Sequence, residues 1–149
     1  MADDILLDFK GINTYYGDLH ALKDVSYTIG RGEIIALLGG NACGKSTTMK
    51  TIMGVVKPAT GTLTFDGESI IGLTPAQRVM RGIAPVLEAR RLFPRMTVFE
   101  NLQMGAAVRN FEHFDEDLEK ICMLFPRIKE RLQQRGGTLS GGEQQMVAI

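Results

Sequence analysis

Residues 39–46 read Gly39-Gly40-Asn41-Ala42-Cys43-Gly44-Lys45-Ser46, which matches the pattern G-x-x-x-x-G-K-[ST]. In this pattern a glycine-rich loop joins a strand to a helix. Five apolar residues without alternation, Ile34 to Leu38, precede the loop. Such a run is typical of a strand buried on both faces of a parallel sheet. Residues from Lys45 to about Gly54 have the character of a helix. The sequence therefore predicts a strand, a phosphate-binding loop and a helix in succession.

The residue types in this loop suit the binding of phosphate. Glycines allow the backbone to curl so that successive N–H groups point at phosphate oxygens. The helix adds its unpaired N–H groups and the positive end of its dipole. Lys45 supplies a cation for the β- and γ-phosphates, and the Ser46 hydroxyl can ligate Mg²⁺. The alternative is an ordinary glycine-rich turn with a surface lysine. With ATP and Mg²⁺ as the cofactors, the candidate residues here are Gly39, Gly40, Asn41, Ala42, Cys43, Gly44, Lys45, Ser46 and Thr47.

Ala42 stands where a small residue lets the backbone approach a nucleotide. If the φ angle of this residue is positive, alanine costs roughly 1–2 kcal/mol that glycine would not. We therefore expect nucleotide binding to be weakened or slowed by Ala42, but not abolished.

Length and composition restrict the class of protein. The chain has 149 residues, enough for one domain and too few for two of ordinary size. Seventeen Lys and Arg balance seventeen Asp and Glu, so no long-range field favours nucleic acid or an anionic membrane.

Cys43 and Cys122 form no disulfide framework or metal-ligand pattern, and they fit a reducing compartment. The acidic start argues against a secretory signal, and no apolar run approaches the ~20 residues of a membrane helix.

Short strands are expected on both sides of the phosphate loop. Residues 5–9, 24–29 and 62–66 have strand character, and Val25, Tyr27 and Ile29 alternate with polar residues as in a half-buried antiparallel strand. Residues 83–87 are expected to form a second parallel strand.

Three capping signals and one periodic segment predict helices. Thr74, Thr97 and Ser140 each precede Gln or Glu by three residues, which is the capping-box pattern. We expect helices to follow them, ending near residue 81 and near residue 108 in the first two cases. Another helix is expected over 114–125, where apolar residues recur at i, i+4, i+7 and i+11.

A second motif, Leu139-Ser140-Gly141-Gly142-Glu143-Gln144-Gln145, lies near the C-terminus. Ser140 caps the helix, and the two glycines leave bare backbone N–H groups that can bind an anion. Combined with the upstream loop, this motif resembles the LSGGQ or LSGGE signature in the ATP-binding subunits of ABC transporters. The resemblance covers the whole chain. Tyr15-Tyr16-Gly17 and the segment 90–102 are most similar to the subunits of branched-chain amino-acid importers.

The resemblance implies further site residues. Tyr16 stands where the family stacks an aromatic ring on adenine, with a simple core position as the alternative. Glu88 stands at the position of the Q-loop, where a carboxylate can ligate Mg²⁺ or a metal-bound water. In the family two subunits sandwich two ATP molecules. Ser140, Gly141 and Gly142 would therefore contact the γ-phosphate held by the other subunit.

The segment around Glu88 departs from the family pattern. The subfamily usually has an aromatic residue at Pro85, proline at Leu87 and glycine at Ala89. Proline cannot donate to a sheet ladder. These departures bear on the geometry of the Q-loop and on its coupling to a membrane partner. Ala42 also replaces the glycine that the family usually has.

The fold implied is α/β, the P-loop NTPase fold of ABC type, with a small antiparallel β portion and a helical subdomain. Residues 1–96 would form the nucleotide-binding core and 97–149 the helical subdomain, together one incomplete domain. The family's Mg²⁺-binding aspartate, catalytic glutamate and switch histidine follow the signature motif. We therefore expect no catalytic residue within this chain, a core that lacks its C-terminal part, and nucleotide binding without turnover.

The implied function is that of an ATP-binding subunit of an ABC importer, for branched-chain amino acids. Its partners would be transmembrane permease subunits and a second ATP-binding subunit, without nucleic acid. The permease would hold the protein at the cytoplasmic face of the cell membrane. Two alternatives stay open: a non-hydrolysing nucleotide-binding module or regulator, and an ABC-type ATPase that has no membrane partner.

Overall fold

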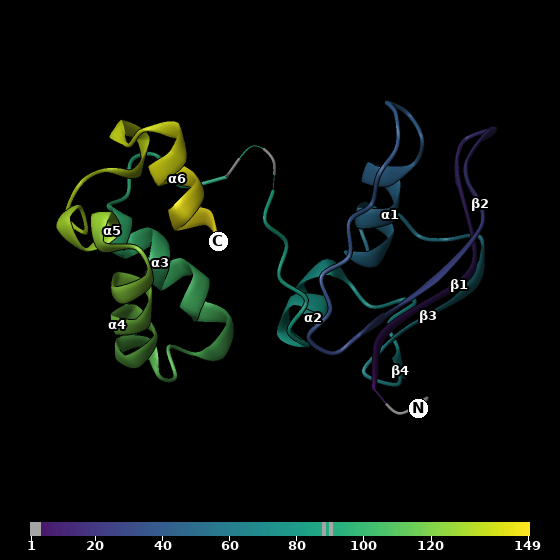
Figure 1. Cartoon of the computed structure of the whole chain (residues 1–149), viewed down its shortest axis with the longest axis horizontal. Coiled ribbons are helices and arrows are strands. Elements are labelled where there is room, and N and C mark those ends of the chain that lie inside the picture. Colours follow the sequence, from purple (N-terminus) through teal and green to yellow (C-terminus); the bar gives the residue numbers. More distant parts are fainter. Residues whose placement is uncertain (1–3, 88, 90) are drawn as a thin grey trace. The chain divides into compact units, whose positions relative to one another are not determined.

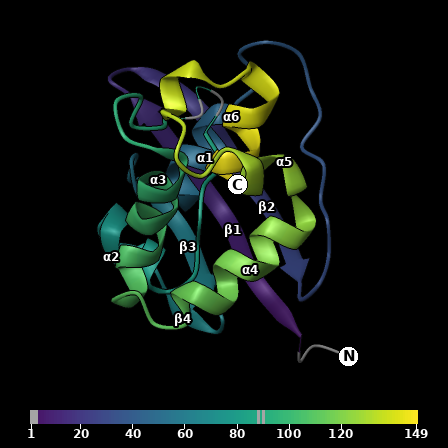
Figure 2. The same cartoon turned by 90° about the vertical axis from the view of Figure 1, so that its left-hand side faces the viewer.

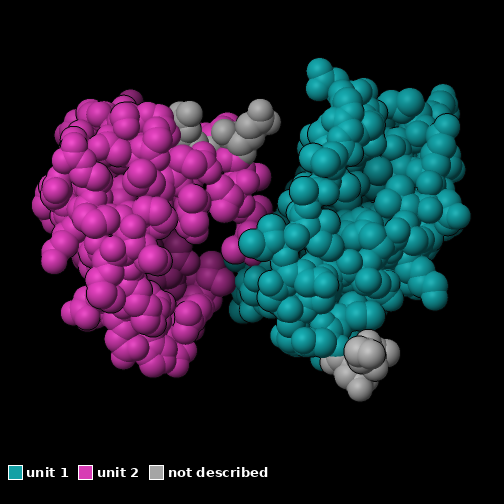
Figure 3. Space-filling model, viewed as in Figure 1, with its two compact units in different colours: residues 1–83 teal, residues 84–149 magenta. Residues whose placement is uncertain are grey.

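The computed structural model describes residues 4–87, 89 and 91–149. The chain divides into two units, residues 1–83 and 84–149 (Figure 3). This boundary precedes the one expected after residue 96. Asn101 shows why, because its side chain accepts a hydrogen bond from Phe93 N at 2.8 Å and donates to the carbonyl oxygens of Phe93 and Met96. The segment before the first helix of the second unit is therefore held by that unit.

Unit 1 is built on a four-stranded antiparallel sheet in the order β2-β1-β3-β4. The strands are β1 (Ile5–Tyr16), β2 (Leu19–Gly30), β3 (Thr60–Phe65) and β4 (Glu68–Ser69). The strands expected at 5–9, 24–29 and 62–66 all form, and the first two are longer than predicted. Their extra length follows from pairing, because β1 hydrogen-bonds to β2 on one edge and to β3 on the other.

The core of unit 1 lies between the sheet and its two helices. Figure 1 shows α1 (Lys45–Ile52) and α2 (Pro75–Met80) on one side of the sheet. Ile52 of α1 joins a buried cluster with sheet residues, and Val25, Tyr27 and Ile29 pack against it half-buried, as their alternation predicted. The other members of the buried cluster are Leu7, Phe9, Ile12, Leu22, Leu63 and Ile70.

The two parallel strands predicted at 34–38 and 83–87 do not form. Ile34 is 100% exposed and Leu38 is 87% exposed, although both were expected in a sheet interior. No backbone hydrogen bond joins 34–38 to any other described segment. An extended segment becomes a strand only when a neighbour takes up its N–H and C=O groups, and no described strand lies alongside this one. In 83–87, Pro85 also removes a ladder donor.

Unit 2 is helical, as predicted for the second half of the chain. Its elements are α3 (Val98–Ala106), the 3-10 helix η1 (Ala107–Arg109), α4 (Phe114–Leu124), α5 (Pro126–Glu130), the 3-10 helix η2 (Gly136–Thr138) and α6 (Gly141–Ala148). Packing runs from α3 to α4, on to α5 and α6, and back to α3 (Figure 2). The buried residues at the centre are Val98, Ile128, Leu139 and Val147.

All three capping boxes predicted from the sequence are present. In each, the hydroxyl of Thr74, Thr97 or Ser140 accepts a hydrogen bond from the backbone N–H three residues later, and the Gln or Glu side chain there accepts one in return. Within the described ranges, no helix is both long enough and apolar enough to cross a bilayer.

Candidate phosphate-binding site

The predicted phosphate loop leads directly into α1, and glycine is required at both of its ends. Gly44 is the N-cap of α1 and has the left-handed φ of 94°. A Cβ atom there would lie 2.7 Å from Leu22 Cδ2 and 3.3 Å from the carbonyl oxygen of Ala21. A Cβ atom on Gly39 would lie 2.5 Å from Cys43 Sγ. Any side chain at either position would force the loop or its neighbours to move.

Ala42 has a φ of 64°, so the condition under which alanine is strained is met. Left-handed backbone at a residue with a Cβ atom costs roughly 1–2 kcal/mol. The loop therefore holds Ala42 in a conformation that glycine would adopt without this cost.

The N-terminus of α1 is arranged differently from those of the other long helices. No side chain caps it, which is also true of α4, but α1 in addition has no acidic residue in its first turn. By contrast, α3, α4 and α6 all carry acidic residues in their first turns. The first backbone hydrogen bond of α1 runs from Thr48 N to Gly44 O at 2.8 Å. The helix thus presents uncompensated N–H groups and a positive dipole end, which together favour an anion.

Lys45 folds back over the loop that precedes it. Its Nζ atom donates to the carbonyl oxygens of Gly39 at 2.8 Å and Gly40 at 2.6 Å, and it lies 3.5 Å from Cys43 Sγ. The ammonium group is therefore already positioned at the loop, where phosphate oxygens could replace the two carbonyls as acceptors.

The remaining predicted loop residues differ in exposure. Asn41 and Ser46 are exposed, so both side chains are accessible from the solvent. Thr47 is buried on the inner side of α1, and its carbonyl oxygen accepts a hydrogen bond from Thr51 Oγ1 at 2.8 Å. The loop residues around Ser46 thus offer side chains to solvent, whereas Thr47 faces the protein.

The β1–β2 hairpin carries a second predicted site residue. Tyr16 ends β1 beside the turn at Gly17 and is 42% exposed, so its ring is available for stacking on a base. The hairpin end and the start of α1 are close, because Gly44 abuts Ala21 and Leu22 of β2. Sequence reasoning did not foresee that the neighbouring Tyr15 stacks on His20, with ring centroids 4.2 Å apart.

The signature-motif residues lie in unit 2, at the start of α6. Ser140 Oγ accepts from Glu143 N at 3.4 Å, and Glu143 Oε2 accepts from Ser140 N at 2.9 Å. The Ser140 N–H that donates to this carboxylate holds the pKa of Glu143 below its usual range. Within the described part of the chain, the N–H groups of Gly141 and Gly142 have no hydrogen-bond partner. Such open N–H groups at a helix start can bind an anion.

An interaction outside the predicted motifs supports this helix start. Arg131 Nε lies 2.9 Å from Glu143 Oε1, so the two oxygens of this carboxylate engage different groups. No sequence signal marks Arg131, because the contact joins α6 to the loop after α5.

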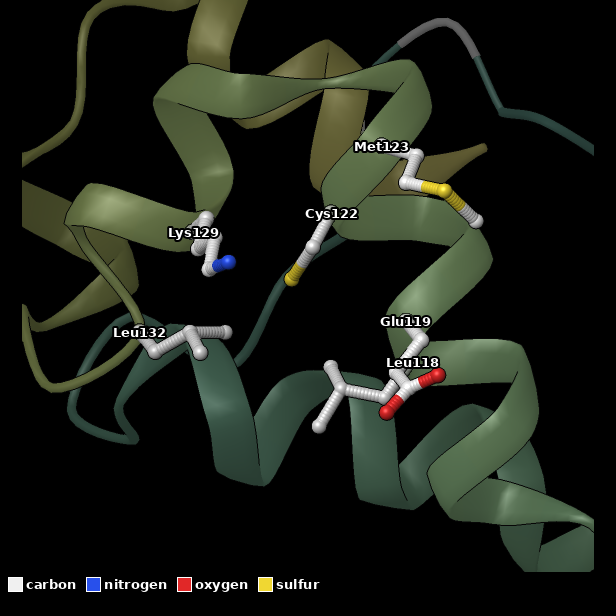
Figure 4. Close-up of a pocket in the computed structure, with 6 residues that line it drawn as sticks. All are labelled: Leu118, Glu119, Cys122, Met123, Lys129 and Leu132. Carbon is white, nitrogen blue, oxygen red and sulfur yellow. The ribbon is translucent and has the colours of Figure 1, made fainter.

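Unit 2 also contains a hollow of about 440 Å³ that includes none of the predicted site residues. The Cys122 thiol and the Lys129 amine point into it from α4 and α5 (Figure 4). The other lining residues are Leu118, Glu119, Met123 and Leu132.

Glu88, the predicted Q-loop residue, lies outside the described residues. Among those that are described, no three His, Cys, Asp or Glu side chains gather as a metal site would require.

Comparison with known proteins gives consistent matches. Residues 22–149 match the family described as ABC transporter. Over 144 residues the chain is 45% identical to BraG of Pseudomonas aeruginosa, a high-affinity branched-chain amino acid transport ATP-binding protein, covering 97% of this chain and 62% of BraG. It is 35% identical to LivF of Archaeoglobus fulgidus, a probable branched-chain amino acid transport ATP-binding protein, covering 93% of this chain and 58% of LivF.

Solved structures agree with these sequence matches. An ATP-binding subunit of an ABC transporter superposes with a TM-score of 0.86 at 29% identity, covering 96% of this chain and 59% of that one. A nucleotide-free ATP-binding cassette superposes with a TM-score of 0.81 at 27% identity, covering 97% and 63%. These superpositions confirm the fold class predicted from the sequence. The chain spans about three fifths of the length of the relatives described.

Proposed function

Because the chain belongs to the ABC transporter family, we propose that it forms the nucleotide-binding part of an ATP-binding subunit that drives the import of branched-chain amino acids. The observation that carries the proposal is the loop at the start of α1. Its helix end is uncapped and free of acidic residues, and the Lys45 ammonium lies against the same loop. This combination of donors fits a polyphosphate.

We propose a role for each group toward bound MgATP. Lys45 and the first amides of α1 would hold the β- and γ-phosphates, and the Ser46 hydroxyl would ligate Mg²⁺. The exposed ring of Tyr16 would stack on adenine. Glu88 is proposed as a further ligand of the metal or of its water.

We extend the proposal to the partners of the protein. Ser140, Gly141 and Gly142 would contact the γ-phosphate bound by a second ATP-binding subunit, through the open amides at the start of α6. Transmembrane permease subunits would hold the assembly at the inner face of the membrane. Two relatives with branched-chain amino acid transport in their names support this substrate class.

Nucleotide binding is tested by removing the Lys45 charge. Lys45→Ala should weaken MgATP binding by about 1.5–3 kcal/mol, the range for a charge-assisted hydrogen bond, when titrated calorimetrically. Lys50→Ala is the matched control, because Lys50 is exposed on the last turn of the same helix. Equal affinities of the wild type and the Lys45→Ala variant would refute the assignment of the loop.

The substrate class needs a separate experiment. The chain should co-purify with the permease subunits of a branched-chain amino-acid importer when they are produced together. Permease subunits of a phosphate importer are the control, because phosphate-import ATP-binding proteins are also related, at 32–36% identity. Retention by the phosphate permease alone would contradict the proposed substrate class while leaving nucleotide binding intact.

A further inference from the structure

Arg78, on α2, is only 2% exposed and is the largest fully buried side chain in the described part of the molecule. Its Nη1 atom donates to the carbonyl oxygens of Thr51 at 2.7 Å and Ile52 at 2.6 Å. Its Nε atom donates to Leu73 O at 3.2 Å. Two of these three acceptors are the last carbonyls of α1, the helix whose first turn follows the phosphate loop.

These contacts make Arg78 a C-terminal clamp on α1. The last carbonyls of a helix have no partner within the helix and carry the negative end of its dipole, so a buried cation there is favourable. Gly54 makes room for the clamp, since a Cβ atom on it would lie 2.7 Å from Arg78 Nε. The guanidinium holds its donors in a fixed planar fork, so Nη1 reaches α1 while Nε reaches Leu73, whereas a lysine ammonium offers its donors from a single point.

The other end of α1 is held by close packing. Gly44 abuts Leu22 and Ala21 of β2, and from there the eight-residue helix runs to Ile52. Such a helix is only about 12 Å long. A change in its tilt at the Arg78 end would therefore move the amides at the phosphate end, where small displacements of donors matter.

We propose that Arg78 is a positioning residue for nucleotide binding: by fixing the C-terminus of α1 it aligns the loop amides and Lys45 at the opposite end. The inference rests on the proposed ATP-binding function. It adds a residue that contacts no nucleotide and lies outside both sequence motifs.

The first test compares MgATP affinity by calorimetry in four chains: wild type, Arg78→Met, Arg78→Lys and Arg81→Met. Arg81 is the matched control. It is the C-cap residue of α2, the helix that carries Arg78, but its side chain is partly exposed and pairs with Glu68. We expect Arg78→Met to bind at least about tenfold more weakly, Arg78→Lys to fall between, and Arg81→Met to match the wild type. Wild-type affinity in a folded Arg78→Met variant would overturn the proposal.

Hydrogen exchange separates a positioning role from a general loss of stability. In Arg78→Met the amides of Thr48 in α1 and of Met53, the C-cap residue of that helix, should exchange faster, while those of β1 and β2 keep wild-type protection. The rescue experiment uses Arg78→Ala. In this variant, millimolar guanidinium, far below denaturing concentrations, should slow the exchange of the same α1 amides and restore MgATP affinity. Uniformly faster exchange without rescue would mean that Arg78 only stabilises the unit as a whole.

Calorimetry and hydrogen exchange together distinguish a failure of the Arg78 proposal from a failure of the proposed ATP-binding function. If the wild type binds no MgATP, the proposed function fails, while exchange in α1 still reports whether Arg78 holds the helix. If Arg78→Met does not fold, Arg78→Lys retains the charge without the fork, and its affinity and exchange decide. Wild-type behaviour of Arg78→Lys in both measurements would then refute the need for a guanidinium.

Discussion

Phe9 and Tyr27 face each other across β1 and β2 and stack with their ring centroids 4.9 Å apart and their planes inclined by 19°. Phe9 is fully buried in the core of unit 1, and Tyr27 packs against that core half-buried. Burial disfavours the charged phenolate and raises the pKa of Tyr27 from its ordinary 10.0 to about 12.

The burial of Tyr27 makes the stability of unit 1 sensitive to alkaline pH. The folded-state pKa is higher than the unfolded one, so the neutral phenol contributes stability that is fully present below pH 10.0. That contribution is lost as the pH rises toward about 12. The urea midpoint should fall more steeply over this range in the wild type than in Tyr27→Phe. Parallel curves would show that Tyr27 ionises as easily in the folded chain as in the unfolded one.

Replacing Ala42 by glycine should relieve the left-handed strain in the phosphate loop. Because φ is 64° at this residue, we expect Ala42→Gly to raise the free energy of unfolding by about 0.5–1 kcal/mol after the entropic cost of glycine is subtracted. The measurement is the urea midpoint at an unchanged m-value, with tighter MgATP binding as a second readout. A lower midpoint would mean that the loop tolerates alanine without strain.

Substitution of two leucines tests whether residues 34–38 are exposed, as in the structure, or packed in a strand, as the sequence pattern predicts. Leu63 is fully buried, so Leu63→Ala should cost about 2–5 kcal/mol in the free energy of unfolding. Leu38 is 87% exposed, so Leu38→Ala should change it by no more than about 0.5 kcal/mol. Chemical denaturation of both variants tests this directly. Similar large losses would place Leu38 in a packed strand after all.

The two cysteines should respond differently to nucleotide. Cys43 is exposed in the phosphate loop, 3.5 Å from Lys45 Nζ, whereas Cys122 lines the hollow in unit 2. At MgATP concentrations ten times the dissociation constant, alkylation of Cys43 should slow about tenfold, because only the free fraction reacts. Peptide mass spectrometry should find Cys122 unaffected. Equal slowing at both sites would point to a change spread over the whole chain.

Local chemistry explains which features the sequence determined. A capping box needs only a hydroxyl and a carboxylate or amide three residues apart, so Thr74, Thr97 and Ser140 each begin a helix as expected. The loop before Lys45 is equally local, since its glycines and the following helix are consecutive in the chain. These parts were predictable because every group they require lies within a few residues.

Tertiary contacts decided the rest. Residues 34–38 have the composition of a buried strand, yet a strand exists only where a neighbour pairs with its backbone, and in the described structure they remain exposed. No motif marks Arg78 in the sequence, yet it is buried, and its guanidinium donates to the last carbonyl groups of α1. Apolar patterning reports what a segment could bury, whereas pairing and burial depend on segments far away in the chain.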